Sequence, residues 1–180
     1  GGNGGFAKIC YNHLLSKLPN IKILLISRNI VESDDITSRV RKIRCDVTNE
    51  DELETLFSHI DDLVGIIHAA GILRDKLFLD LKQDDFQSII DVKAKAAKYL
   101  LEKTKYKHLK FVLFTSSIVS GFGNIGQTNY AMANSMLDYL AVEWQKLGYP
   151  IYSIQLGPLD LDGDGMASRE ILDHLKSQGF

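Results

Sequence analysis

Apolar and polar positions alternate in blocks along the chain. Short apolar runs rich in β-branched residues predict strands at Ile21–Ser27, Val40–Val47, Leu63–Gly71, Leu109–Ser117 and Pro150–Pro158. Apolar residues with helical spacing predict helices at Phe6–Leu18, Glu50–His59, Gln83–Lys103, Gln127–Leu147 and Ala167–Ser177. Nearly continuous apolar strands separated by helices are typical of a parallel sheet covered on both faces. We therefore predict a doubly wound α/β fold of the Rossmann type.

Composition narrows the class of protein. The 180 residues are enough for one domain with a real core, and the formal net charge of −2 gives no reason to expect a nucleic-acid or membrane partner. The longest apolar runs have the length of a strand and are too short to span a bilayer. Cys10 and Cys45 are far apart, so we expect reduced thiols and a reducing, cytoplasmic compartment. The five histidines lack metal-ligand spacing, so we expect no metal.

The chain opens on the glycine-rich stretch GGNGGFA, in which Gly1, Gly2, Asn3, Gly4 and Gly5 precede a predicted helix. Glycines let a backbone turn tightly against a pyrophosphate, and the helix N-terminus offers free N–H groups to it. A glycine-rich end is also compatible with a simple tail. In a doubly wound sheet such a loop follows a central first strand, and no strand precedes it here. We therefore expect residues 1–180 to be the cofactor-binding catalytic half of a larger multidomain protein.

The end of the predicted strand Ile21–Ser27 bears on which dinucleotide would bind. An acidic residue at this point would bind the ribose 2′-hydroxyl of NAD, but the chain has Ser27 and Arg28. A planar guanidinium pairs well with the 2′-phosphate of NADP. The alternative is that Arg28 is an ordinary surface charge. The position favours NADPH as the cofactor.

Four polar residues in the second half of the chain have the chemistry of carbonyl reduction. Tyr130 and Asn134 are one helical turn apart, Ser117 ends a predicted strand, and Lys93 lies on the preceding helix. A carbonyl oxygen needs a proton as hydride reaches its carbon, and a nearby ammonium would shift the pKa of a tyrosine toward the working pH. The serine hydroxyl could orient the carbonyl, and the asparagine could bridge lysine and tyrosine through water.

Each residue of this set also has a structural explanation. Tyr130 fits a half-buried helix position, and Lys93 fits a solvated face beside Lys95 and Lys98. Asn134 is harder to explain, because asparagine is a poor helix former and its neighbours are small and apolar. Taken together with the glycine loop, the four residues favour a catalytic site over four unrelated positions.

The motifs of the chain resemble, in order, those of ketoreductase domains of modular polyketide synthases, which belong to the short-chain dehydrogenase/reductase superfamily. The resemblance covers residues 1 to about 166 and rests on GGNGGFA, SR, CDV, HAAG, DVKAKA, FVLFTSS, GNIGQTNYAMANSMLDYLA and QLGPL. Ordinary members of the superfamily have a lysine four residues after the tyrosine. Here that position is Asn134 and the lysine lies upstream, an exchange typical of these synthase ketoreductases.

The resemblance implies a role for each matching residue. Tyr130 would donate the proton, Ser117 would orient the carbonyl, and Lys93 and Asn134 would complete a tetrad. The residues implied in NADPH binding are Gly1, Gly2, Asn3, Gly4 and Gly5 at the phosphates, Arg28 at the 2′-phosphate, Asp46 and Val47 at the adenine, and Ala69, Ala70 and Gly71 beside the ribose and nicotinamide. His68, which ends a predicted strand, is interpreted as a packing residue.

The resemblance also bears on stereochemistry. Asp75 matches the last aspartate of the family's Leu-Asp-Asp loop, while Arg74 replaces the first, and Phe122 occupies the loop in which the alternative type has a tryptophan. This combination is similar to the B type, which gives the D-configured product. Two positions depart from the family pattern: Ala7 replaces the last glycine of the loop, and QLGPL replaces a tryptophan-containing segment.

The resemblance thus implies NADPH-dependent reduction of a 3-ketoacyl thioester on an acyl carrier protein to a 3-hydroxyacyl thioester during polyketide biosynthesis. The implied partners are the carrier protein, the neighbouring synthase domains and a second copy of the parent synthase in a homodimer. Two alternatives remain. One is a free-standing short-chain reductase of a small ketone, and the other is an inactive reductase-like scaffold.

Overall fold

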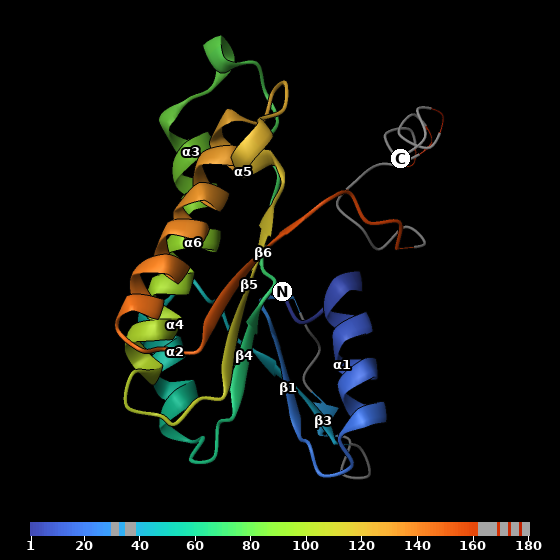
Figure 1. The fold of residues 1–180 in the computed structure, drawn as a ribbon, viewed down its shortest axis with the longest axis vertical. Helices are drawn as coiled ribbons and strands as arrows, with labels where there is room; N and C mark the ends of the chain where they lie inside the picture. The colour runs from blue at the N-terminus through green and yellow to red at the C-terminus, as the bar shows by residue number, and fades with distance from the viewer. Residues whose placement is uncertain (30–32, 35–38, 162–168, 170–172, 174–176, 178–180) are drawn as a thin grey trace. The chain divides into compact units, whose positions relative to one another are not determined.

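The computed structural model of the chain describes residues 1–29, 33–34 and 39–161, together with 169, 173 and 177. These residues form an α/β fold that divides into two compact units (Figure 1). Unit 1 contains residues 1–44 and 157–180, and unit 2 contains residues 45–156. The predicted α/β class with parallel strands is confirmed, although the strands form two three-stranded sheets rather than one.

Unit 1 holds the glycine loop and the first sheet. Helix α1 (Gly5–Lys17) begins directly after the loop, and strands β1 (Ile23–Ser27), β2 (Ser33–Asp34) and β3 (Val40–Arg44) follow. The order across the sheet is β1-β3-β2, with β1 parallel to β3 and the two-residue β2 antiparallel to it. The pattern did not predict β2, because a two-residue strand has no periodicity to detect.

Unit 2 holds a fully parallel sheet in the order β4-β5-β6, built from Gly65–His68, Phe111–Ser117 and Ile151–Leu156. The longer helical elements are α2 (Glu50–Ser58), α3 (Gln83–Ile90), α4 (Ala96–Thr104) and α6 (Thr128–Lys146). Between α3 and α4 lies a π-helical turn, η2 (Asp91–Lys95), so the predicted helix Gln83–Lys103 is one continuous helical stretch with a local change of winding. Two short helices, η1 (Phe78–Asp80) and α5 (Val119–Phe122), complete the unit and were not predicted.

The core of unit 2 lies between α4, α6 and the central strand. Helices α4 and α6 lie on the same face of the sheet (Figure 1). Their apolar positions meet the alternating apolar residues of β5, and the fully enclosed set is Ala97, Leu101, Val112, Phe114, Leu137, Ala141 and Ile151. This packing fixes α6 against the ends of β5 and β6, which is where the polar residues of the candidate site lie.

The structure also bears on the predictions made for the two cysteines, for membrane-spanning segments and for the C-terminal helix. Cys10 and Cys45 are both free thiols, as predicted, and burial raises the pKa of Cys45 to about 11. No helix among the described residues is long and apolar enough to cross a membrane. The helix predicted at Ala167–Ser177 lies almost wholly outside the described residues.

Candidate active site

Lys93 lies on the π-helical turn η2 and is almost completely buried, with 3% of its surface exposed. Its ammonium Nζ donates to the backbone oxygen of Thr115 on β5 at 2.8 Å. Burial lowers the pKa of Lys93 to about 8, because a charged group loses solvation in the interior. The solvated-face explanation for Lys93 is therefore wrong, and the π turn is what directs this side chain toward β5 while Lys95 stays exposed.

His68 supports the same turn from the end of β4. Its ring Nε2 donates to the backbone oxygen of Lys93 at 3.0 Å, and the ring packs edge-on against Phe114. Burial lowers the pKa of His68 to about 3, so the imidazole is neutral at ordinary pH. The backbone of Lys93 is thus held by β4, and its side chain is held by β5.

Ser117 is the last residue of β5 and is buried. Its hydroxyl oxygen accepts a hydrogen bond from the backbone N–H of Val119 at 3.3 Å, which fixes the turn into α5. The carboxyl end of a parallel strand is where ligands bind in this architecture. The Ser117 hydroxyl therefore lies at the edge of the sheet where this architecture places ligands.

Helix α6 brings Tyr130 and Asn134 to the same place. The Nζ atom of Lys93 lies 5.5 Å from the centroid of the Tyr130 ring. Asn134 is fully buried, and its Nδ2 donates to the backbone oxygen of Tyr130 at 2.9 Å. Its Oδ1 is buried and has no hydrogen-bond partner among the described residues, which is unusual for a buried polar atom. The structure thus places Lys93, Ser117, Tyr130 and Asn134 around one point of unit 2.

The pKa of Tyr130 differs from the expectation. Burial raises it, and the nearby side chains of Asn134 and Ser117 offset this rise only in part. The predicted lowering by Lys93 is wrong for this arrangement, because the ammonium lies over the ring and is hydrogen-bonded to Thr115, not to the phenol oxygen. A raised pKa keeps the phenol protonated, which is the state that a proton donor requires.

Asn129 is a buried residue of the site that the sequence analysis missed. It is fully buried, and its Oδ1 accepts from the backbone N–H of Tyr130 at 2.9 Å. Its Nδ2 donates to the backbone oxygens of Arg74 at 2.9 Å and Asp85 at 3.3 Å. Asn129 therefore ties Tyr130 to the loop of Arg74 and to α3. An asparagine at the start of a predicted helix was the signal that could have revealed it.

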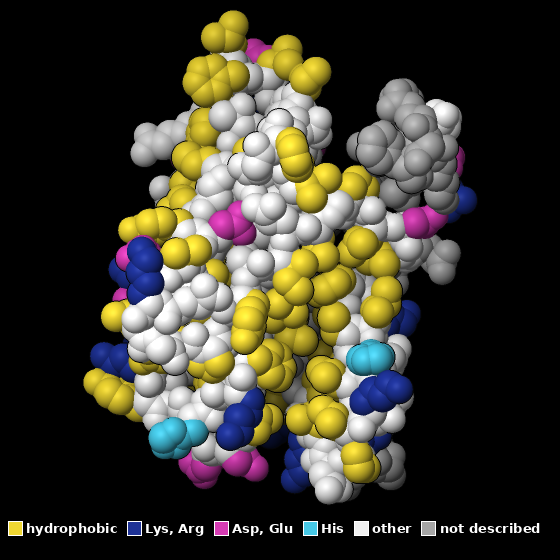
Figure 2. All heavy atoms as spheres, in the orientation of Figure 1, with side chains coloured by type: hydrophobic (Ala, Val, Ile, Leu, Met, Phe, Trp, Pro, Cys, Tyr) yellow, Lys and Arg dark blue, Asp and Glu magenta, His cyan; other side chains and the backbone are white. Residues whose placement is uncertain are grey.

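The loop that carries Asp75 runs beside the start of α6. Gln127 Nε2 donates to Asp75 Oδ2 at 2.8 Å, and the backbone N–H of Lys76 donates to the oxygen of Gly126 at 2.9 Å. Phe122, by contrast, is 90% exposed. Figure 2 shows hydrophobic side chains gathered at this end of unit 2, where Leu77, Phe78, Leu79, Phe122 and Ile125 are exposed. The structure thus anchors Asp75 near Tyr130 and leaves Phe122 in solvent.

The glycine loop of unit 1 is shaped for close approach of backbone. The N–H of Gly2 donates to the oxygen of Ile26 on β1 at 2.9 Å, and a Cβ at Gly2 would lie 2.6 Å from the Ile26 nitrogen. Helix α1 begins at Gly5 with no side-chain cap and no acidic residue in its first turn. These features fit a phosphate-bearing cofactor, because the free N–H groups and the positive end of the helix dipole favour an anion.

The other residues predicted to bind the cofactor are divided between the units. Arg28 follows β1 in unit 1, whereas Asp46, Val47, Ala69, Ala70 and Gly71 belong to unit 2. The Asp46 carboxylate accepts from the N–H and hydroxyl of Thr48, at 2.9 and 2.8 Å, in the turn that leads into α2. Among the described residues, no group of three or more His, Cys, Asp or Glu side chains is arranged to hold a metal ion.

Comparison with known proteins gives a consistent result. The sequence profile described as KR domain matches residues 1–160. The chain is 34% identical over 166 residues to polyketide synthase GfsA of Streptomyces halstedii, covering 84% of this chain and 2% of that protein. It is 31% identical over 196 residues to the highly reducing polyketide synthase poxF of Penicillium oxalicum, covering 100% of this chain and 8% of that protein. The chain thus spans only a few per cent of the length of these curated relatives.

Solved structures share the fold. The ketoreductase from the first module of phoslactomycin biosynthesis in Streptomyces sp. HK803 matches with a TM-score of 0.87 at 23% identity, covering 99% of this chain and 44% of that one. At this level of identity the match speaks for the fold alone. It agrees with the α/β fold found in this chain.

Proposed function

This chain belongs to the KR domain family, the ketoreductase domains of polyketide synthases, and from this premise we propose that it reduces a 3-ketoacyl thioester with NADPH. The substrate in this proposal is carried by an acyl carrier protein, and the product is the 3-hydroxyacyl thioester. Reduction of a β-keto group with a nicotinamide cofactor is the activity of the family. The choice of NADPH, the carrier-bound substrate and the residue roles below are parts of the proposal.

The observation that carries the proposal is that the side chains of Lys93 and Tyr130 lie next to each other. An ammonium lies 5.5 Å from the centroid of a phenol ring, and both groups are largely removed from solvent. The two side chains come from separate helical elements, and the end of β5 supplies Ser117. Chance does not explain why Lys93 is buried with no carboxylate in hydrogen-bond contact among the described residues, since burying a charge in this way destabilises the fold.

In the proposed mechanism, Ser117 and Tyr130 both donate hydrogen bonds to the ketone oxygen of the substrate. Bound NADPH supplies the hydride to the carbonyl carbon. The Tyr130 hydroxyl gives its proton to the oxygen as the negative charge develops there. The Lys93 ammonium stabilises the resulting phenolate electrostatically. Asn134, whose buried Oδ1 has no hydrogen-bond partner among the described residues, would hold a water between Lys93 and Tyr130, and a proton from solvent would return to the phenolate through that water.

The cofactor would be held mainly by backbone. Gly1, Gly2, Asn3, Gly4 and Gly5 would surround the phosphates, and the start of α1 would direct N–H groups at them. Arg28 would pair with the 2′-phosphate, because a guanidinium makes bidentate hydrogen bonds with phosphate. In unit 2, the family resemblance assigns Asp46 and Val47 to the adenine and Ala69, Ala70 and Gly71 to the ribose and nicotinamide, and these assignments remain predictions.

We assign the stereochemistry to the B type within this proposal. Asp75 is anchored by Gln127 three residues before Tyr130, so it is positioned to contact the substrate beside the proton donor. Phe122, in the loop where the other type has a tryptophan, is exposed. Chiral analysis of the 3-hydroxy product decides this assignment, and an L-configured product would overturn it without affecting the reductase proposal.

The direct test is NADPH oxidation by the full-length protein that contains this chain, with a 3-ketobutyryl thioester as substrate. Tyr130→Phe removes only the proton donor and should lower turnover by roughly 10²- to 10⁴-fold. Tyr139→Phe is the matched control, since Tyr139 is 64% exposed on the same helix and should leave turnover unchanged. Binding of NADPH without turnover would instead favour an inactive scaffold. Turnover of small ketones but not thioesters would favour a free-standing reductase.

A further inference from the structure

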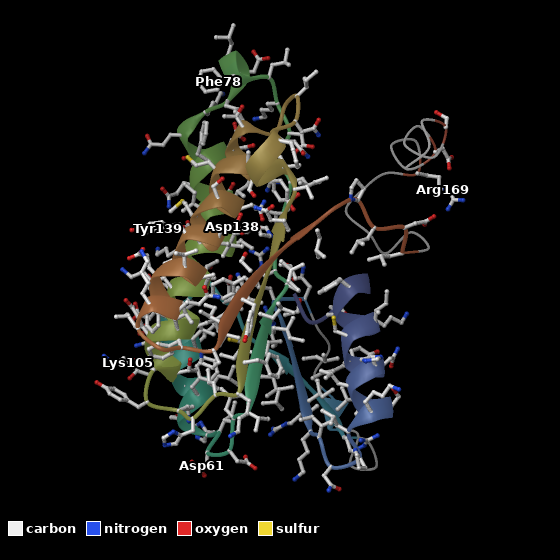
Figure 3. The ribbon with its side chains drawn as sticks, viewed as in Figure 1. Asp61, Phe78, Lys105, Asp138, Tyr139 and Arg169 are labelled. Atoms are coloured by element: carbon white, nitrogen blue, oxygen red, sulfur yellow. The ribbon has the colours of Figure 1, made fainter. Side chains whose placement is uncertain are left out.

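Asp138 lies on α6 at the same face as Tyr130 and Asn134, because the three residues follow one another at intervals of four. Figure 3 shows Asp138 on the side of α6 toward the sheet, whereas the neighbouring Tyr139 lies on the outer side. Neither the sequence motifs nor the mechanism above uses this carboxylate. Its surroundings show that it is not an ordinary surface charge.

The carboxylate of Asp138 is held by neutral donors from two other elements. Its Oδ1 accepts from the Ser153 hydroxyl at 2.6 Å, and its Oδ2 accepts from the Ser120 hydroxyl at 2.8 Å and from Gln155 Nε2 at 2.9 Å. Burial by itself raises the pKa of Asp138, but the hydrogen bonds from Ser153, Gln155 and Ser120 outweigh it and keep the pKa below the ordinary carboxyl value. Asp138 is therefore ionised and fixed in position.

The negative charge on Asp138 is not cancelled by a direct cation. Within residues 39–161, no Lys or Arg side chain forms an ion pair with it, and the hydroxyl and amide groups that donate to it are neutral. Because no cation in this part of the chain neutralises this carboxylate, its negative charge can interact with the charged groups of the candidate active site. Partial burial strengthens that interaction, because less water screens it.

The pairing of β5 with β6 brings Asp138 close to Lys93. Thr115, whose backbone oxygen accepts from Lys93, is paired with Ile154, and the two neighbours of Ile154 in the strand, Ser153 and Gln155, hold the Asp138 carboxylate. Lys93 has a neutral hydrogen-bond acceptor, the Thr115 backbone, and the attraction of Asp138 opposes the loss of its proton on burial. The other charged groups on the elements around Lys93 have partners of their own: Asp85 with Lys76, Asp91 with Lys95, and Lys98 with Glu102. The His68 ring on β4 is neutral, and Tyr130 on α6 is a phenol. Asp138 is thus the carboxylate whose attraction opposes the effect of burial and favours the charged form of Lys93.

We propose that Asp138 is a positioning residue of the reductase, whose fixed carboxylate keeps the Lys93 ammonium charged so that it can stabilise the Tyr130 phenolate. The proposal rests on the proposed roles of Lys93 and Tyr130. Ser120, Ser153 and Gln155 take part by holding the carboxylate on α6. In this arrangement three successive turns of α6 carry the proton donor Tyr130, the bridging amide Asn134 and the counter-charge Asp138.

The test is the pH dependence of ketoreduction by the full-length protein with a 3-ketobutyryl thioester. If a charged Lys93 is required, the wild-type rate falls as pH rises through about 8. In Asp138→Asn this fall should move to lower pH by about 1 unit, the shift that one nearby charge produces, while the rate on the low-pH plateau stays at the wild-type level. Glu143→Gln, which removes an exposed carboxylate from the same helix, should leave the profile unchanged.

A second variant avoids any folding defect at position 138. Gln155 is an exposed residue that donates to the Asp138 carboxylate. In Gln155→Lys the new ammonium should neutralise that carboxylate. The fall in rate should then also move to lower pH. An unshifted profile in both variants would overturn the proposal, as would an equal loss of rate at every pH. Tyr130→Phe separates this from the proposed function: if that variant is inactive while the profiles do not shift, the reductase mechanism stands and the role of Asp138 falls.

Discussion

The Nζ atom of Lys93 lies 5.5 Å from the centroid of the Tyr130 ring, although the two residues are separated by 37 positions in the chain. Its hydrogen bond goes to the backbone of Thr115, so the ammonium stays near the phenol without making a contact that would compete with substrate. A phenolate formed at Tyr130 would therefore find a positive charge already in place. Preorganised charge of this kind requires no rearrangement during the reaction.

Replacing Lys93 should make the protein more stable and less active. Its pKa in the folded state, about 8, lies below the ordinary lysine value of 10.5, so below about pH 8 the buried charge lowers the free energy of unfolding. Lys93→Met should raise that free energy by about 2 kcal/mol at pH 7 while abolishing turnover. The difference from wild type should shrink as pH rises from 8 to 10.5, because Lys93 then loses its proton on folding.

Urea unfolding of the Lys93 variant at pH 7 and pH 9 gives this measurement. Lys95→Met is the control on the same π turn, because that side chain is exposed and should change stability very little. A Lys93→Met protein that is less stable than wild type at pH 7 would contradict the expectation. It would mean that the hydrogen bond to Thr115 outweighs the cost of burying the charge.

Asn129 should be important for the position of Tyr130. Asn129→Leu removes one buried and two partly buried hydrogen bonds, to Asp85, Arg74 and Tyr130, and the loss of each costs about 0.5–1.5 kcal/mol. We expect unfolding to occur at clearly lower denaturant concentration and turnover to fall. Asn124→Ala, which changes an exposed asparagine just before α6 whose side chain donates to Gln127, should be nearly neutral. Equal stability of the two variants would show that Asn129 is dispensable.

The glycine loop offers a matched pair of substitutions. A methyl group at Gly2 would meet the backbone of β1 at 2.6 Å, so Gly2→Ala should displace the loop and weaken NADPH binding. At Gly4 the nearest atom would be the Gly1 oxygen at 3.5 Å, an ordinary contact, so Gly4→Ala should bind the cofactor more nearly like wild type. Fluorescence titration with NADPH compares the two. Indistinguishable affinities would show that the approach of Gly2 to β1 does not shape the cofactor site.

Arg28 should decide between the two dinucleotides. Arg28→Asp reverses the charge at the end of β1 and should weaken NADPH binding about tenfold or more, because a charge-assisted contact to phosphate is lost and replaced by repulsion. NADH binding should be little affected. Lys22→Asp, just before the other end of the same strand, controls for the change in net charge. An equal loss of affinity for both cofactors would remove the 2′-phosphate assignment.

The sequence by itself determined the class of fold and much of the site chemistry. Apolar runs such as FVLF report burial on both faces of a strand, and the spacing of Ala133, Leu137 and Ala141 reports the buried face of α6. Both signals are local, because side-chain period follows directly from backbone geometry. The motifs around Ser117, Tyr130 and Asn134 are likewise contained in one continuous stretch of the chain.

Tertiary structure decided the properties that depend on neighbours distant in sequence. The burial of Lys93 comes from a π turn that periodicity does not reveal, and its pKa reflects solvation lost beneath α6 and β5. The same enclosure raises the pKa of Tyr130, contrary to the expectation from a nearby ammonium alone. Asp138 and Asn129 look like ordinary helix residues until β6, α5 and the Arg74 loop supply their partners. Desolvation and hydrogen bonding depend on every atom that lies near a group in the folded protein. The order of residues along the chain does not show which atoms those are.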